Sequence, residues 1–407
     1  MASYLTGIIT PHRKHTKKSP TIRMNVPKTV TIPMEMHIGK PAIPTVKVGD
    51  LVKVGTKIGE ADGKISSNIY SSVSGKVVKF VEYLLFNGSV TTAAVIESDG
   101  EMTMEEGLTP PTVNTKEDLI EAIKASGVIG LGGAGFPAHV KLTTSPDKPI
   151  DTLIINGAEC EPYITANHRL MLEKADEILV GVSLIMKAVN VNRAYIGIEN
   201  NKPDAIKLMQ EKAKSYPQIE IVPLKVQYPQ GGEKQLIDAV IGRQVPAPPA
   251  IPISVGAVVQ NVGTAFAIYE AVMKNKPLIS RIITVTGKSV KTPSNLLARL
   301  GTPFSQLIDE CGGLPADTGK IIGGGPMMGK ALISLDIPMT KGSSGLLIMN
   351  EKEARRTAPE ACIRCAKCVS ACPMGLEPYL LAKISSQNMW EEAEKEDVVS
   401  CIECGSC

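Results

Sequence analysis

The chain has 407 residues, which predicts roughly three domains rather than one. Its net charge of +3, with 21% charged residues, argues against a nucleic-acid-binding protein or an acidic tail. No apolar run approaches the ~18 residues of a membrane-spanning helix, and no basic segment precedes an apolar one at the N-terminus as in a signal peptide. We therefore expect a soluble or peripheral protein, in a reducing compartment because its cysteines are clustered as for metal.

The first 30 residues are basic and irregular. Lysine and arginine are concentrated at Arg13, Lys14, Lys17 and Lys18. Such a charge run is usually a solvated face, so we expect a solvated arm. Docking of this arm on an acidic partner or a lipid surface is the alternative.

Residues 30 to 97 alternate short β-branched runs with Gly, Pro and Asp turns, which predicts a small all-β sandwich. The phrases Val-Lys-Val-Gly-Asp (46–50) and Val-Ser-Gly-Lys-Val-Val (73–78) resemble the biotinyl/lipoyl hammerhead. Those carrier domains present a lysine at a hairpin tip, usually beside Met or Asp. The turn here, Asp62-Gly63-Lys64, does not match that signature, so we interpret the fold as structural and keep a lipoyl-type carrier as an alternative.

A glycine-rich loop follows the helical period of residues 117–126. Its glycines allow positive φ and leave amide N–H groups bare, which suits a phosphate cradle. The loop residues that we single out are Gly130, Gly132, Gly133 and Gly135.

Strand and helix then alternate. Strands are predicted at 151–155, 194–198 and 219–226, with helices at 168–189 and 203–214, a pattern that predicts a parallel sheet covered by helices. Because the carboxyl ends of parallel strands share one edge, polar residues that follow them predict a ligand site. These residues are Asn156, Glu159, Glu161, Glu199, Asn200, Asn201, Gln227, Gly231, Gly232 and Glu233.

A proline-rich loop at 244–252 leads to Asn261 and a helix ending near Met273. A compact α/β unit follows from about 278 to 350, with a strand at 282–287 and a helix near 303–310. Residues 351–359 form a charged connector.

Seven of the nine cysteines form two runs near the end of the chain. The spacing of the first run, closed by Pro373, is that of bacterial ferredoxins, although paired CxxC also binds zinc. We expect iron–sulfur clusters; the remaining Cys160 and Cys311 are interpreted as small buried residues, and His139 as a packing or loop residue. The ligands are Cys362, Cys365, Cys368, Cys372, Cys401, Cys404 and Cys407.

The second run stops at Cys407, before the fourth cysteine and proline that its spacing leads us to expect. In two-cluster ferredoxins the fourth cysteine of a run binds the other cluster. We therefore expect Cys372 to join Cys401, Cys404 and Cys407 in one stable [4Fe–4S] cluster. The other cluster would be labile or empty in these 407 residues, and we expect the natural protein to continue.

Together these motifs carry a family resemblance. Gly-Gly-Ala-Gly-Phe-Pro (132–137) with Lys141, Asn-Gly-Ala-Glu-Cys-Glu-Pro (156–162), Gly-Glu (232–233) and Asn-Val (261–262) resemble the NADH-oxidising flavoprotein subunit of complex I. The order of the whole chain is closer to the RnfC family, the peripheral flavin subunit of the Rnf complex. The resemblance implies a multidomain α+β fold with four parts. These are a hammerhead-like β sandwich with its basic arm (1–110), a Rossmann-like α/β domain for FMN and NAD(H) (111–277), a β-grasp domain of the SLBB type (278–350) and a ferredoxin-like dicluster segment (351–407).

The resemblance also implies residue roles. FMN would lie on the glycine loop, with Lys141 near its phosphate and Asn156, Glu159 and Asn261 near the flavin. NAD(H) would stack on the flavin, with Glu161 and Glu233 near its nicotinamide and ribose and Phe136 near its adenine. Leu131 and Ala158 depart from the complex I pattern, where an arginine and an acid are usual.

NAD(H) exchanges a hydride and iron–sulfur clusters exchange single electrons; a flavin can do both, so we expect it to stand between them. The resemblance implies an NAD⁺:ferredoxin oxidoreductase subunit that sits peripherally on the cytoplasmic face of the bacterial cell membrane, with integral partners that move Na⁺ or H⁺. The alternatives are a cobalamin-reducing flavoprotein of the PduS type, which domain order disfavours, and a non-redox scaffold, which the cysteines disfavour.

Overall fold

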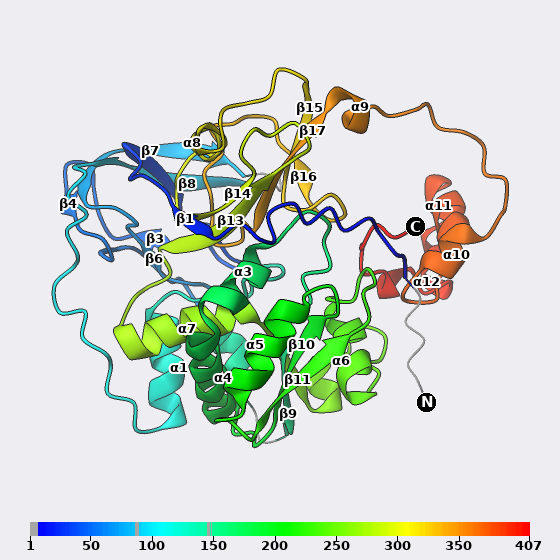
Figure 1. Cartoon of the computed structure of the whole chain (residues 1–407), viewed down its shortest axis with the longest axis horizontal. Coiled ribbons are helices and arrows are strands. Elements are labelled where there is room, and N and C mark those ends of the chain that lie inside the picture. The colour runs from blue at the N-terminus through cyan, green and yellow to red at the C-terminus, as the bar shows by residue number, and fades with distance from the viewer. Residues whose placement is uncertain (1–6, 86–88, 145–146, 148) are drawn as a thin grey trace.

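The computed structural model describes residues 7–85, 89–144, 147 and 149–407. Figure 1 shows a main body made of a β-rich part, a helix-rich part and a further sheet, with the helices near the C-terminus standing to one side. No helix among the described residues is long and apolar enough to cross a membrane.

The N-terminal part is all-β, as predicted. Its larger sheet has the order β2-β8-β7-β4, and a second sheet has the order β3-β5-β6. Two strands are longer than the sequence led us to expect, since β7 has 10 residues and β8 has 9. The bounds are β2 (Thr29–Pro33), β3 (Ile43–Pro44), β4 (Leu51–Val52), β5 (Lys57–Glu60), β6 (Ile69–Tyr70), β7 (Gly75–Leu84) and β8 (Val90–Ser98).

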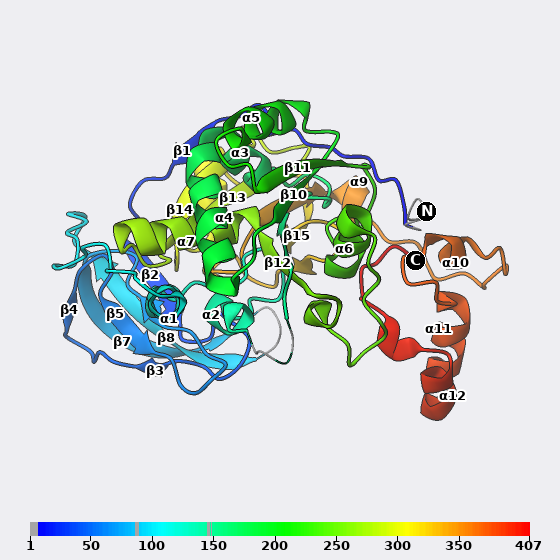
Figure 2. The same cartoon turned by 90° about the horizontal axis from the view of Figure 1, so that it is seen from below.

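The helix-rich part is built on a parallel sheet of order β11-β10-β9-β12, which confirms the parallel arrangement predicted from the sequence. Alternate residues of β9 enter different cores: Leu153 and Ile155 pack with α4 and α7, whereas Ile154 packs with α6. Figure 2 shows these helices on opposite sides of the sheet. The strands are β9 (Thr152–Asn156), β10 (Ala194–Glu199), β11 (Ile219–Leu224) and β12 (Ala257–Asn261).

Seven helices accompany this sheet in the described residues. They are α1 (Lys116–Ala125), α2 (Ala138–Leu142), α3 (Ala166–Glu173), α4 (Ala175–Val189), α5 (Pro203–Ala213), α6 (Glu233–Ile241) and α7 (Val262–Lys274), with a short 3₁₀ turn, η1 (Pro252–Val255), before β12.

The single helix predicted at 168–189 is wrong, because the chain breaks at Lys174 into α3 and α4. Lys174 leaves helical geometry, with φ −138° and ψ 35°. The break lets α3 pack against β13 of another sheet while α4 packs along α7. Apolar spacing alone continues through this bend, so it could not reveal it.

The third sheet has the order β1-β14-β13-β17-β15-β16 and is covered by α8 (Phe304–Glu310). Its residues Ile283 and Val285 lie in one hydrophobic core with Val30 and Ile32 of the N-terminal part. The two parts, far apart in sequence, are therefore packed as one body. The strands are β1 (Thr21–Arg23), β13 (Ser280–Thr286), β14 (Ser294–Arg299), β15 (Thr318–Gly323), β16 (Lys330–Ala331) and β17 (Gly345–Asn350).

The basic N-terminal arm lies along the main body, and most of its charged side chains, including Arg13, Lys17 and Lys18, are exposed as expected for a solvated arm. Ile8 pairs with Tyr228, Thr16 is fully buried, and β1 adds a parallel strand beside β14. The arm is held because its backbone completes a sheet edge and Lys14 donates to three backbone carbonyls.

The C-terminal segment is helical and has a small core of its own around Cys372, Leu381 and Ile384. A connector after α9 leads to it, as Figure 1 shows. Its elements are α9 (Glu351–Ala354), α10 (Lys367–Ala371), α11 (Pro378–Ser386), α12 (Trp390–Lys395) and the 3₁₀ turn η2 (Val398–Ser400).

Lys341, in the loop before β17, joins three parts of the body. Its ammonium group donates to the Asn68 carbonyl at 2.6 Å, the Gly127 carbonyl at 2.8 Å and the Ser67 hydroxyl at 3.1 Å. The side chain is fully buried, and this burial lowers the pKa of Lys341 to about 7.

Stability should therefore rise with pH through Lys341. Between about pH 7 and its ordinary pKa of 10.5, the unfolded chain holds a proton on this lysine that the folded chain has lost. The free energy of unfolding of the native chain, minus that of Lys341→Met, should increase in this window by up to about 1.4 kcal/mol per pH unit.

Urea unfolding of both proteins at several pH values measures this difference, with Lys64→Met as a control at an exposed lysine. Parallel pH profiles for the native chain and Lys341→Met would contradict the burial of a titrating ammonium group.

Candidate functional site

Two asparagines lie at the carboxyl edge of the parallel sheet. Asn156 ends β9 and Asn261 ends β12, and they are direct partners in the strand register. The Asn261 side chain accepts from the Gly263 N–H at 2.7 Å, capping α7, and donates to the Asn156 carbonyl at 3.3 Å. Asn261 is thus fixed as the junction between the sheet edge and a helix N-terminus.

The glycine loop lies against this junction. A Cβ atom on Gly132 would come within 2.5 Å of the Asn261 side-chain nitrogen, so only glycine fits there. The Leu131 N–H donates to the Thr264 hydroxyl at 2.9 Å, which anchors the base of the loop. Gly132, Gly133 and Ala134 are exposed at its crest. Within the described residues, their N–H groups make no hydrogen bond.

Two further contacts close the site on the α6 side. Lys141 of α2 forms an ion pair with Glu233 at the start of α6, at 2.5 Å. The Asn156 side chain donates to the Gly231 carbonyl at 2.8 Å. Gly232 is the N-cap of α6.

The structure therefore brings most of the predicted site residues to one edge. The Gly130 N–H donates to the Phe136 carbonyl at 2.8 Å, and Phe136 is half-buried behind the loop. Gly135 has a φ of +78°, as the turn requires. The gathered residues are Gly130, Gly132, Gly133, Gly135, Phe136, Lys141, Asn156, Gly232, Glu233 and Asn261.

Two other predicted acids, Glu159 and Glu161, are occupied by backbone amides. Glu159 accepts from the N–H groups of Asn167 and His168, in the first turn of α3. Glu161 accepts from the N–H groups of Met327 and Met328, in a turn of the third sheet, at 3.1 and 2.8 Å. Burial raises the pKa of Glu161, and these two amide bonds oppose that rise. Both carboxylates thus fasten loops together.

The seven clustered cysteines lie in the C-terminal segment. Cys372 and Cys404 are buried, Cys368 is half-buried, and the other four are exposed. The pKa of Cys407 is raised, first by burial and then by the neighbouring thiols of Cys404, Cys372 and Cys401. The fourth cysteine of the first run thus lies close to the second run. Among the described residues, no three Cys, His, Asp or Glu side chains are grouped closely enough to hold a metal ion as they stand.

Comparison with known proteins places these features in a family. Four family models match: the RnfC barrel sandwich hybrid domain (2–101), the Nuo51 FMN-binding domain (123–270), the SLBB domain (282–331) and a 4Fe-4S dicluster domain (355–407). A component of the proton-translocating ferredoxin:NAD(+) oxidoreductase complex of Clostridium ljungdahlii is 46% identical over 388 residues, covering 94% of this chain and 84% of that protein. This chain belongs to the RnfC family.

A second relative and a solved structure are also similar to this chain. The corresponding component of the Na(+)-translocating ferredoxin:NAD(+) oxidoreductase complex of Acetobacterium woodii is 44% identical over 399 residues, covering 97% of this chain and 89% of that protein. The NAD+-reducing [NiFe]-hydrogenase in its H2-reduced state superposes with a TM-score of 0.49 and 19% identity, over 59% of this chain and 47% of that one. The relatives do not support the PduS-type alternative.

Lys14 of the arm holds the loop from Glu159 to Ile164. The ammonium group donates to the carbonyls of Ile164 at 2.5 Å, Glu161 at 2.7 Å and Glu159 at 2.8 Å. Within this loop Glu159 and Tyr163 have φ of 50° and 71°, a region that residues other than glycine seldom adopt. Burial lowers the pKa of Lys14 to about 8, and the nearby Glu159 carboxylate opposes this. Lys14 thus stabilises a strained loop at the site.

Sequence reasoning missed three residues that shape the site: Lys14, Thr264 and Arg281. Arg281 of β13 is buried and donates to the carbonyls of Lys341 at 2.5 Å and Leu131 at 3.2 Å. Burial lowers its pKa to about 10. A single arginine between the apolar residues of a strand was the available signal, because such a charge needs a buried acceptor.

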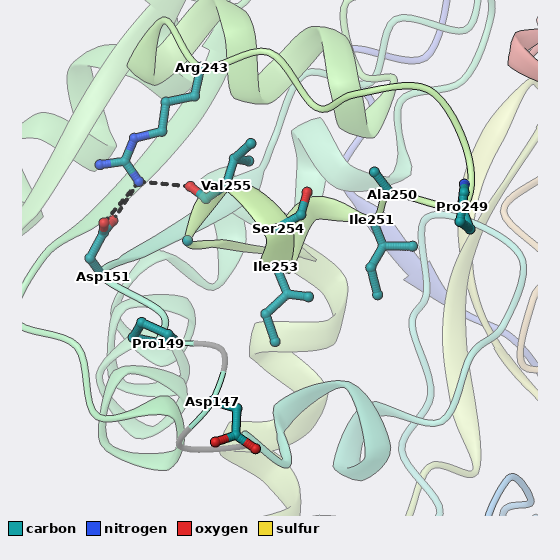
Figure 3. Close-up of a pocket in the computed structure, with 11 residues that line it drawn as sticks. Asp147, Pro149, Asp151, Arg243, Pro249, Ala250, Ile251, Ile253, Ser254 and Val255 are labelled. Carbon is teal, nitrogen blue, oxygen red and sulfur yellow. Dashed lines mark hydrogen bonds and ion pairs between the residues drawn. The ribbon is translucent and has the colours of Figure 1, made fainter.

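A hollow of about 510 Å³ lies elsewhere, at the amino edge of the parallel sheet. Figure 3 shows it beside Arg243, which pairs with Asp151 at 2.7 Å and donates to the Val255 carbonyl. Since β9 and β12 begin here and end at the glycine loop, this hollow is at the opposite end of the sheet from the site described above.

Replacing Lys14 by Met should loosen the 159–164 loop. Three carbonyls would lose a charged donor, and leaving such groups unpaired costs about 1–3 kcal/mol. We expect hydrogen exchange of the Tyr163 amide, which donates to the His12 carbonyl, to become roughly tenfold faster or more. Lys17→Met, at an exposed lysine of the same arm, should leave it unchanged; equal exchange in both variants would mean that Lys14 does not hold the loop.

Proposed function

We propose that this RnfC-family chain is the electron-transfer subunit of a membrane-associated ferredoxin:NAD⁺ oxidoreductase. It would exchange hydride with NAD(H) through FMN and single electrons through [4Fe–4S] clusters. The observation that carries the proposal is the joining, in one chain, of an FMN-binding domain of the Nuo51 type and a 4Fe–4S dicluster domain. The Clostridium and Acetobacterium relatives bear the name of such oxidoreductase complexes.

The residues at the glycine loop fit FMN. Exposed amides at Gly132, Gly133 and Ala134 suit a phosphate, which needs several N–H donors converging on one point. Lys141 supplies a positive charge at the same edge, shared with Glu233. When bound, the flavin supplies the exchange between hydride and single electrons.

The chain's own residues orient the reactants. Asn156 and Asn261 fix the sheet edge on which the flavin would lie, and Thr264 holds the loop from below. Phe136, Glu161 and Glu233 remain the residues proposed for NAD(H) on the basis of the family resemblance. Because the Glu161 carboxylate is bonded to Met327 and Met328, its part would be to position the neighbouring turn against the dinucleotide.

The seven clustered thiols fit [4Fe–4S] clusters, since thiolates at this spacing are the ligands of such centres. We propose the domain limits 1–110, 111–277, 278–350 and 351–407, with a hammerhead-like sandwich, a Rossmann-like flavin domain and a β-grasp domain of the SLBB type as the first three. The matched family ranges and the sheet orders support them.

The place that we propose is the cytoplasmic face of the bacterial cell membrane, with the chain in a peripheral position. Integral subunits would move Na⁺ or H⁺ there, and ferredoxin would exchange electrons indirectly. Membership in a family whose relatives are named as components of ion-translocating complexes supports this place.

Substitution of Gly133 tests FMN binding. Open space surrounds this residue, so a methyl group fits and Gly133→Ala should keep its FMN. The indole of Gly133→Trp would fill the phosphate side of the loop and cost about 1–3 kcal/mol of binding, roughly tenfold to a hundredfold in affinity. Flavin content and FMN titration of the folded proteins measure this. Equal FMN affinity in the Trp and Ala variants would contradict a flavin at this loop.

A further inference from the structure

The dicluster segment returns to the main body through its second cysteine run. Figure 2 shows the last residues (red) passing beside α6 after leaving α12. The Tyr228 hydroxyl donates to the Cys404 carbonyl at 2.6 Å, and Tyr228 is only 2% exposed. A Cβ atom on Gly405 would lie 3.0 Å from the Met327 carbonyl, so the run is in close contact with the turn that Glu161 holds.

A second contact joins α6 to the first cysteine run. The Gln235 side-chain amide donates to the Met374 sulfur at 3.1 Å. Met374 is two residues after Cys372, the last cysteine of that run. Gln235 lies in the first turn of α6, close behind Glu233, which pairs with Lys141.

One contact is on Cys404 and the other on Met374, two residues after Cys372, and both cysteines are ligands expected for the same cluster. In two-cluster ferredoxins the fourth cysteine of one run binds the cluster of the other run, which groups Cys372 with Cys401, Cys404 and Cys407. Cys362 and Cys365 of the other group are exposed. In the described part of the chain, neither side chain makes a hydrogen bond to the helix-rich part.

Tyr228 lies in the helix-rich part, near the sheet edge where FMN is proposed to bind. It follows β11 at the carboxyl edge of the sheet, near Gly231, whose carbonyl is held by Asn156. Its backbone exchanges two hydrogen bonds of 2.9 Å with Ile8 of the arm. The hydroxyl group therefore projects from a fixed backbone, and the distance between the sheet edge and Cys404 depends on it.

We propose that the cluster held by Cys372, Cys401, Cys404 and Cys407 is the one that takes electrons directly from the flavin site, and that Tyr228 is the residue that positions it. This inference rests on the proposed function. For each hydride taken from NADH, two electrons leave the flavin singly. Each reduces this cluster by one electron before a further one-electron carrier reoxidises it, and the proton is released to water.

Tyr228→Phe tests the positioning role in protein loaded with FMN and clusters. It should bleach its flavin with NADH at the native rate, but reduce the adjacent cluster about tenfold or more slowly, because a displacement of about 1 Å has effects of this order. Dithionite should still reduce the cluster fully, and hydrogen exchange at residues 404–406 should rise. Tyr379→Phe, which removes an exposed hydroxyl from α11 of the same segment, is the matched control.

Cysteine variants of protein loaded with both clusters test the order of the clusters without relying on Tyr228. In Cys404→Ser, the remaining cluster should be reduced by dithionite but only slowly by NADH. In Cys365→Ser, NADH should reduce the remaining cluster about tenfold or more faster than it does in Cys404→Ser, as followed by freeze-quench EPR and iron content. The opposite pattern, or equal rates in Tyr228→Phe and Tyr379→Phe, would overturn the inference. Native protein whose flavin is absent or does not bleach with NADH would instead mean that the proposed function is wrong.

Discussion

Lysine side chains that donate to backbone carbonyls hold this protein together. Lys341 joins the N-terminal sheet, the helix-rich part and the loop before β17, and Lys14 fastens the arm to the 159–164 loop. Taking an ammonium group out of water costs several kcal/mol unless its hydrogen bonds are met. Because the acceptors come from separate segments, the cations are satisfied only when these segments are assembled. The relative position of the parts is therefore specified by polar contacts as well as by the shared apolar core.

This constraint reaches the candidate site. The glycine loop is supported from outside its own domain, since Arg281 of the third sheet donates to the Leu131 carbonyl. Glu161, in the helix-rich part, is connected to the third sheet in turn, because its carboxylate accepts from the N–H groups of Met327 and Met328. The third sheet thus supports the loop that would hold FMN. The turn at Met327 and Met328 also contacts Gly405 of the dicluster segment. The proposed flavin site and the proposed cluster site are therefore both in contact with the third sheet and its turn.

Local patterns in the sequence predicted the parts that depend on near neighbours. The strand-end position of Asn156 predicted that it lies at the carboxyl edge of a parallel sheet, and the structure confirms this position; its pairing with Asn261 was not predicted, because no strand was expected before Asn261. The roles of these residues toward FMN and NAD(H) stay predictions. What the sequence could not reveal depends on distant contacts. The bend at Lys174 follows from packing on β13, and the folding-back of the arm follows from acceptors about 150 residues away. From the sequence, the carboxylates of Glu159 and Glu161 were expected to face a ligand, because the backbone amides that bind them lie elsewhere in the chain.

The most direct test of the account is the anaerobic optical spectrum of the protein, loaded with FMN and clusters, before and after NADH. The account predicts that flavin absorbance bleaches first and that the broad cluster absorption then falls, with a one-electron EPR signal appearing in parallel. A flavin that NADH leaves oxidised, or one that bleaches while clusters reducible by dithionite stay oxidised, would contradict an electron path from NAD(H) through this edge of the sheet to the cysteines.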